Sequence, residues 1–165
     1  MMRTGIGYDI HRLSEGRPMM IGGVSIPYHK GTMGHSDGDA LLHAVCDAVL
    51  GALSRGDIGD MFPDSDDRYK GAQSRALLSE IVKLMDSDGY DIVNLDCIVV
   101  LQEPKLGVFK EKIRNEISGI LGISCDRVNV KAKTNERLGE IGAGDAAAAY
   151  AAVLLKKRRN DDVGY

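Results

Sequence analysis

Strand-like and helix-like segments alternate along this chain, and their order limits the folds that it can adopt. Residues 39–53 carry apolar side chains at helical spacing behind a polar, capping-type stretch, so they predict a helix. Residues 3–11 alternate small and apolar positions before a polar cluster, which predicts a strand. The same patterns predict a hairpin at residues 19–26, helices at 72–86 and 108–121, and strands at 92–101 and 128–133. This order predicts a mixed α/β or α+β sandwich in which helices cover one sheet face.

Further features of the sequence predict the number of domains, a long loop and the structure of the C-terminal segments. A chain of 165 residues, 44% of them hydrophobic, is predicted to form one domain over residues 1–165. Residues 56–68 are rich in Gly, Asp and Pro and predict a long loop of the kind that is often functional. Residues 146–155 are rich in alanine, so local propensity alone favours a helix there. A basic run followed by two aspartates predicts a solvated, frayed tail over residues 156–165.

Composition argues against several classes of protein. The net charge of -3 gives no footprint for nucleic acid, because phosphate-backbone binding needs a surplus of Lys and Arg on one face. No run approaches the ~20 apolar residues of a membrane span, and the first residues lack the apolar stretch of a signal peptide. Cys46, Cys97 and Cys125 are odd in number and far apart, which predicts buried thiols rather than disulfides or a thiolate zinc site. We therefore expect a soluble, cytoplasmic protein.

One set of side chains has the composition of a catalytic zinc site. Asp9 and His11 stand two apart on a predicted strand, so both leave the same face. His43 lies on the first predicted helix with Asp39 and Asp47 four residues to either side, and a neighbouring aspartate could orient its ring. Asp9, His11 and His43 would leave one position open for a substrate oxygen. The alternative for His43, a histidine satisfied within the core, stays open.

Three polar stretches could bind phosphate groups or a second cation. The run from His35 to Asp39 precedes the first helix, whose positive end favours phosphate, although simple N-capping is the alternative. Residues 56–59 and 62–66 offer carboxylates and tight turns, or else form a solvated turn. Residues 131–136 place Lys, Thr and Glu at a strand end, which suits a diphosphate with a divalent cation at Glu136.

Six motifs, in order along nearly the whole chain, resemble the 2-C-methyl-D-erythritol 2,4-cyclodiphosphate synthase family. They are GIGYDIHRL at residues 5–13, IGGVxIP at 21–27, GHSDGDALLHA at 34–44, DAVLGA at 47–52, GDIGDMFPD at 56–64 and VNVKAKTNE at 128–136. The resemblance implies a homotrimer of ferredoxin-like α+β protomers, with a mixed sheet facing the threefold axis and helices outside. It also implies active sites between neighbouring subunits and a strand, not a helix, at residues 146–155.

The resemblance implies an enzyme, a phosphorus–oxygen lyase of the non-mevalonate (methylerythritol phosphate) isoprenoid pathway. The 2-phosphate of 4-diphosphocytidyl-2-C-methyl-D-erythritol 2-phosphate would attack the β-phosphorus, so that CMP leaves and 2-C-methyl-D-erythritol 2,4-cyclodiphosphate forms. This chemistry asks the protein to hold the reacting groups in line and to stabilise charge on the oxygens. The residues alone leave open an alternative, a zinc-dependent phosphohydrolase in which water is the nucleophile.

The resemblance assigns roles to individual residues. Asp9, His11 and His43 match the zinc ligands, and Glu136 matches the ligand of a second ion, magnesium or manganese. His35 and Thr134 match catalytic residues that position the diphosphate and stabilise the transition state. The implied substrate contacts are Asp9, Ile10, His11, His35, Ser36, Asp57, Ile58, Gly59, Phe62, Pro63, Asp64, Ser65, Asp66, Leu101, Gln102, Glu103, Pro104, Lys105, Leu106, Gly107, Ala132, Lys133, Thr134, Asn135 and Glu136.

Two positions depart from the family pattern. After Leu138 and Gly139, relatives commonly carry a Phe and, three residues later, an Arg, which hold an isoprenoid diphosphate in a cavity on the threefold axis. This chain carries Glu140 and Ala143 there. Because a carboxylate replaces a ring and a guanidinium is lost, we expect this cavity not to bind isoprenoid diphosphates.

Overall fold

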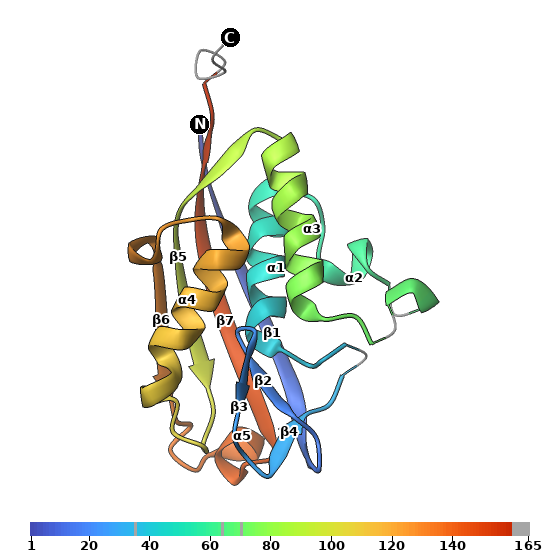
Figure 1. Ribbon diagram of the computed structural model, residues 1–165, viewed down its shortest axis with the longest axis vertical. Helices are drawn as coiled ribbons and strands as arrows, with labels where there is room; N and C mark the ends of the chain where they lie inside the picture. The colour runs from blue at the N-terminus through green and yellow to red at the C-terminus, as the bar shows by residue number, and fades with distance from the viewer. Residues whose placement is uncertain (35, 64, 70, 160–165) are drawn as a thin grey trace.

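A computed structural model describes residues 1–34, 36–63, 65–69 and 71–159 of the chain (Figure 1). The strands are β1 (Met2–Glu15), β2 (Met19–Ile21), β3 (Val24–Ile26), β4 (Lys30–Thr32), β5 (Tyr90–Val100), β6 (Val128–Lys133) and β7 (Ala146–Lys157). The α-helices are α1 (Ala40–Leu53), α2 (Ile58–Met61), α3 (Ser74–Ser87), α4 (Lys110–Leu121) and α5 (Gly139–Ala143). Short 3-10 helices are η1 (Asp67–Tyr69), η2 (Gly107–Phe109) and η3 (Cys125–Arg127).

Five strands form one mixed sheet in the order β4-β1-β7-β5-β6. Only β5 and β6 run parallel to each other, and the other neighbours in this sheet are antiparallel. Figure 1 shows α1, α3 and α4 on the same side of the sheet, where α1 packs on β1 and β7 and α4 packs on β6. The predicted α+β sandwich with helices on one face is confirmed.

The alanine-rich segment is the central strand β7, as the family resemblance implied and against its local propensity. It pairs with β1 on one side and β5 on the other, so both edges of its backbone are hydrogen-bonded. Ala147, Ala149 and Ala151 are at most 1% exposed beneath α1, where larger side chains would keep the helix away from the sheet. Tertiary pairing here outweighs helix propensity.

Two glycines of β1 let α1 lie directly against the strand. A Cβ added to Gly5 would lie 1.9 Å from the carbonyl oxygen of Ala48, and one added to Gly7 would lie 1.9 Å from that of Ala44. No side chain fits into this contact, because it is formed by the helix backbone. The Gly-x-Gly sequence that precedes Asp9 therefore serves close helix–strand packing, which places α1 above Asp9 and His11.

We expect Gly7→Ala to destabilise the fold by about 3 kcal/mol, since α1 must move away from β1 to admit the methyl group. Thermal denaturation measures this as a lower Tm. Gly119→Ala is the matched control, because a Cβ added there on α4 meets nothing within 4 Å and alanine is the better helix former. A Gly7→Ala protein as stable as Gly119→Ala would contradict the close packing.

The structure corrects two expectations about boundaries. The segment 56–68 was expected to be a loop throughout, but it contains α2, because Asp57 and Asp60 form a reciprocal capping box at its start. Lys156 and Lys157 were assigned to a frayed tail, but they belong to β7, where Lys156 pairs with Met2 and Lys157 with Tyr90. Residues 160–165 of that tail lie outside the described residues.

The structure also bears on the predicted burial of the cysteines and on the search for membrane-spanning segments. Cys46 and Cys97 are fully buried, as predicted, and burial raises the pKa of Cys97 to about 12. Cys125 is only half-buried, because its thiol lies at the surface against Ser118 and Asn115. Within the described ranges, no helix has both the length and the apolar character to cross a membrane.

Candidate functional site

Asp9, His11 and His43 converge on one point between β1 and α1. Asp9 Oδ2 lies 2.9 Å from His11 Nε2 and 2.9 Å from His43 Nδ1, and the two ring nitrogens are 3.1 Å apart. Donor atoms bound tetrahedrally to a small divalent ion lie about 3.3 Å from one another, so this triangle is close to the size that such an ion requires. The three residues fit a metal ion with little movement.

The electrostatics of this triangle favour a cation. Burial raises the pKa of Asp9, but hydrogen bonds with His11 and His43 outweigh it and hold the pKa well below its usual range. The hydrogen bond with Asp9 raises the pKa of His11, in part against its burial. A carboxylate and two imidazoles thus share a partly buried site in which a positive charge is stabilised.

The groups that hold the His43 ring differ from those expected. Its outer nitrogen, Nε2, lies 3.0 Å from Ser36 Oγ and 2.9 Å from Ser74 Oγ. The expectation that Asp39 or Asp47 orients the ring is wrong, because both ring nitrogens bond to other groups. The Asp39 carboxylate instead accepts from the backbone of Gly22, Gly23 and Leu42, and Asp47 accepts from that of Ile58. Ser74 begins α3, 31 residues along the chain from His43, so spacing in the sequence gave no signal for it.

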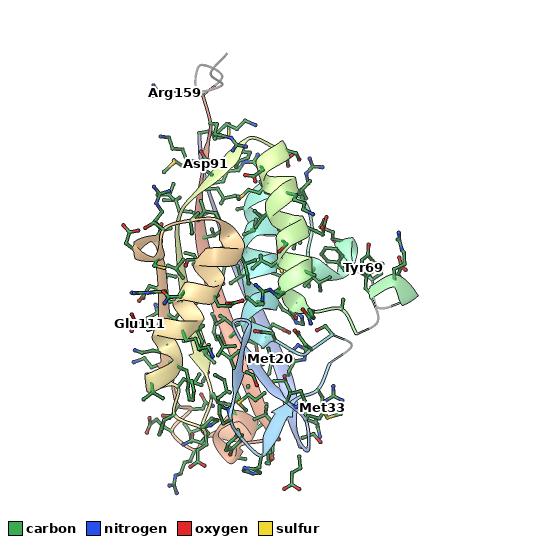
Figure 2. All side chains as sticks on the ribbon, viewed as in Figure 1. Met20, Met33, Tyr69, Asp91, Glu111 and Arg159 are labelled. Atoms are coloured by element: carbon green, nitrogen blue, oxygen red, sulfur yellow. The ribbon has the colours of Figure 1, made fainter. Side chains whose placement is uncertain are left out.

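A cavity of about 590 Å³ opens beside the triad. Its lining residues are His11, Gly34, Ser36, His43, Ile58, Gly59, Phe62, Pro63, Tyr69 and Leu77. Tyr69, the last residue of η1 and labelled in Figure 2, meets Phe62 edge to face with the ring centroids 5.1 Å apart. The predicted contacts Ser36, Ile58, Gly59, Phe62 and Pro63 are brought together here, whereas Gly34, Tyr69 and Leu77 were not predicted.

Other predicted contacts of this part of the chain lie outside the cavity lining. Asp57 caps α2, and Asp66 forms an ion pair with Arg68. Ser65 is exposed, and Ile10 is 44% exposed on the opposite face of the sheet. His35 and Asp64 lie outside the described residues.

A second cavity, of about 230 Å³, lies where the parallel strands β5 and β6 end. It is lined by Leu101, Pro104, Lys105, Leu106, Gly107, Lys110, Ala132, Lys133 and Thr134, of which only Lys110 was not predicted. Gln102 and Glu103 line a different cavity, together with Arg137. Among the residues that the structure describes, the cavity beside the triad and this one have no lining residue in common.

Thr134 and Glu136 are neighbours at the end of β6. Thr134 Oγ1 donates a hydrogen bond of 2.6 Å to Glu136 Oε1, while Asn135 Nδ2 donates to the carbonyl of Leu138. The Glu136 carboxylate is exposed, and its backbone has the left-handed φ of 48°. In the described part of the chain, the triad is the one group of three ligating side chains, and Glu136 is not in it. An ion at Glu136 would take its other oxygen ligands from water and a bound phosphate.

Comparison with known proteins gives consistent matches. The model of the YgbB family matches residues 2–156. A protein of Laribacter hongkongensis named 2-C-methyl-D-erythritol 2,4-cyclodiphosphate synthase is 54% identical over 157 residues, which cover 95% of this chain and 97% of that protein.

Solved structures agree with these matches. A 2C-methyl-D-erythritol-2,4-cyclodiphosphate synthase in its CDP-bound form has a TM-score of 0.87 at 39% identity, over 93% of this chain and 100% of that one. The bifunctional IspDF from Campylobacter jejuni has a TM-score of 0.92 at 40% identity, over 96% of this chain but 43% of that longer chain.

Proposed function

The chain belongs to the YgbB family, together with the cyclodiphosphate synthases that it matches, and from this we propose the reaction that it catalyses. It converts 4-diphosphocytidyl-2-C-methyl-D-erythritol 2-phosphate to 2-C-methyl-D-erythritol 2,4-cyclodiphosphate and CMP, in the cytoplasm, as a step of the non-mevalonate isoprenoid pathway. A 2-phosphate oxygen forms a bond to the β-phosphorus, the bond from that phosphorus to the bridging oxygen breaks, and CMP departs with the bridging oxygen.

The observation that carries this proposal is the convergence of Asp9, His11 and His43 beside the 590 Å³ cavity, which the two histidines line. These residues would hold zinc, which as a Lewis acid polarises a phosphate oxygen. The apolar wall formed by Ile58, Phe62 and Tyr69 would cover the methylerythritol carbons and exclude water from the phosphorus. Exclusion of water favours attack by the substrate's own phosphate over hydrolysis.

The second cavity would hold the cytidine diphosphate part of the substrate. Backbone groups at the ends of β5 and β6 would contact the base, and Lys105 and Lys133 supply positive charge for phosphate oxygens. The Thr134 hydroxyl, which now donates to Glu136, could donate to a phosphate oxygen once Glu136 coordinates magnesium or manganese. Thr134 would thereby position the diphosphate for in-line attack.

A homotrimer would bring the two cavities together. The sheet face opposite the helices exposes apolar side chains: Ile6 is 76% exposed, Tyr8 47%, Ile10 44% and Tyr150 42%. An apolar sheet face of this kind is typical of a surface that another subunit covers. We propose that three such faces surround a threefold axis and that the triad of one subunit meets the second cavity of its neighbour.

Incubation with 4-diphosphocytidyl-2-C-methyl-D-erythritol 2-phosphate and Mg²⁺ tests the reaction. We expect stoichiometric release of CMP, measured by chromatography, which stops after removal of zinc by a chelator and returns when zinc is added. If the zinc-replete protein leaves the substrate unchanged, the proposed reaction is wrong.

Mixed trimers test whether the site lies between subunits. His43→Ala and Thr134→Ala should each be inactive, but their random co-assembly should restore about one quarter of the sites, because each site then takes its halves from different chains. Co-assembly of His43→Ala with Asp9→Ala is the control and should restore nothing, since both changes affect the same half. Equal inactivity of the two mixtures would refute a site shared between subunits.

A further inference from the structure

We infer that Ser74 and Asp37 form a positioning relay that fixes the tautomer of His43 and thereby strengthens metal binding at the triad. The inference deepens the proposed function and rests on its zinc site. It assigns a role to two residues that do not touch the reacting groups and that lie in different segments, the loop before α1 and the first turn of α3.

The direction of the hydrogen bonds follows from the acceptor at the end of the relay. The Ser74 hydroxyl donates to Asp37 Oδ1, because a carboxylate can only accept. Its single proton is therefore used, and the hydroxyl can only accept from His43 Nε2, 2.9 Å away. With a proton kept on Nε2, the lone pair of the neutral ring lies on Nδ1, the nitrogen that faces Asp9 and His11 and that would exchange its hydrogen bond to Asp9 Oδ2 for a bond to the ion.

Burial makes this arrangement rigid. Ser74 is 0% exposed, and Asp37 Oδ2 also accepts from the backbone N–H of Ser74, which caps the first turn of α3. The N-cap residue Gln73 makes no side-chain cap of its own, so Asp37 supplies that cap from the loop before α1. The backbone of α3 thus holds the Asp37 carboxylate in place, and that carboxylate orients the Ser74 hydroxyl.

Ser36 contacts the same ring nitrogen but lacks this property. Its hydroxyl lies 3.0 Å from His43 Nε2 and accepts from the backbone N–H of Gly38, so its own proton remains free to point toward the ring. A hydroxyl that can either donate or accept does not choose between the two tautomers. Ser36 is therefore the matched control for Ser74.

The test measures zinc affinity by competition with a chromophoric chelator, with thermal denaturation of each variant alongside. Ser74→Ala breaks the relay but keeps the backbone cap on Asp37, so we expect zinc to bind about 10–100-fold more weakly while the Tm changes little. Ser36→Ala should weaken zinc binding by less. Asp37→Asn, which removes the charge, should also weaken it, and should add no further loss in a Ser74→Ala background because the link is already broken.

Each outcome decides the question. Zinc binding by Ser74→Ala as tight as that of the unmodified protein, an equal loss in Ser36→Ala, or additive losses in the double variant would each overturn the relay while leaving the zinc site intact. Absence of zinc binding by the unmodified protein would overturn both the relay and the proposed site. Should Ser74→Ala not fold, Asp37→Asn alone decides, and unchanged affinity in it overturns the relay.

Discussion

Replacing His43 with alanine is expected to lower the rate of CMP formation by about 1000-fold or more. The change removes one of three converging donors, and the charge stabilisation that a bound metal gives to a phosphate oxygen amounts to several kcal/mol. Because the His43 side chain lines a cavity and makes its contacts there with polar groups, the fold itself should survive. Steady-state kinetics with the diphosphocytidyl substrate, and zinc content measured by atomic absorption, report the two effects.

His29→Ala is the control for this variant. His29 packs against Tyr28 and lines a different cavity, so its loss should leave both zinc content and turnover near those of the unmodified protein. Full activity of His43→Ala, or an equal loss in His29→Ala, would be incompatible with a metal site at the triad.

Replacing Asp39 with alanine is expected to lower the free energy of unfolding by about 4 kcal/mol. Its carboxylate is 0% exposed and accepts from three backbone donors, at 2.9 Å from Gly22, 2.6 Å from Gly23 and 3.0 Å from Leu42. The change leaves those donors without their acceptor and removes the N-cap of α1, and it detaches the β2–β3 hairpin from the helix that carries His43. Urea denaturation followed by circular dichroism measures the loss.

Asp47→Ala is the matched comparison on the same helix. Asp47 is half-buried and accepts from one backbone donor, Ile58, at 2.8 Å, so its loss should cost about 1 kcal/mol. Equal stabilities of the two variants would show that the three bonds to Asp39 do not hold the hairpin to α1.

The parts of the fold that local patterns determine could be predicted from the sequence. α1 begins and ends close to the predicted limits, because its apolar period and its cap at Asp39 are both local features. β7 could not be predicted from its own residues, since alanine favours a helix and only pairing with β1 and β5 makes it a strand. α2 is four residues long and depends on the Asp57–Asp60 capping box, a signal too short to stand out in a glycine-rich segment.

The candidate site likewise contains residues that the sequence could identify and residues that it could not. Asp9 and His11 could be paired from the alternation of a strand. His43 was a candidate third ligand from its place on the helix, and the family resemblance favoured that role over a core histidine. The hydroxyl of Ser74 reaches His43 from α3, and the ring of Tyr69 reaches the cavity from η1. Only the tertiary packing brings these two elements beside β1. Asp39 and Asp47 satisfied the helical spacing for a partner of His43, but unpaired backbone N–H groups nearby were stronger competitors for their carboxylates.

Phosphorus NMR of the products formed from 4-diphosphocytidyl-2-C-methyl-D-erythritol 2-phosphate tests the central claim most directly. We predict the two coupled resonances of a cyclic diphosphate together with the single resonance of CMP. A linear product with terminal phosphate resonances would contradict the proposal, because it would show that water, and not the 2-phosphate of the substrate, attacks the phosphorus.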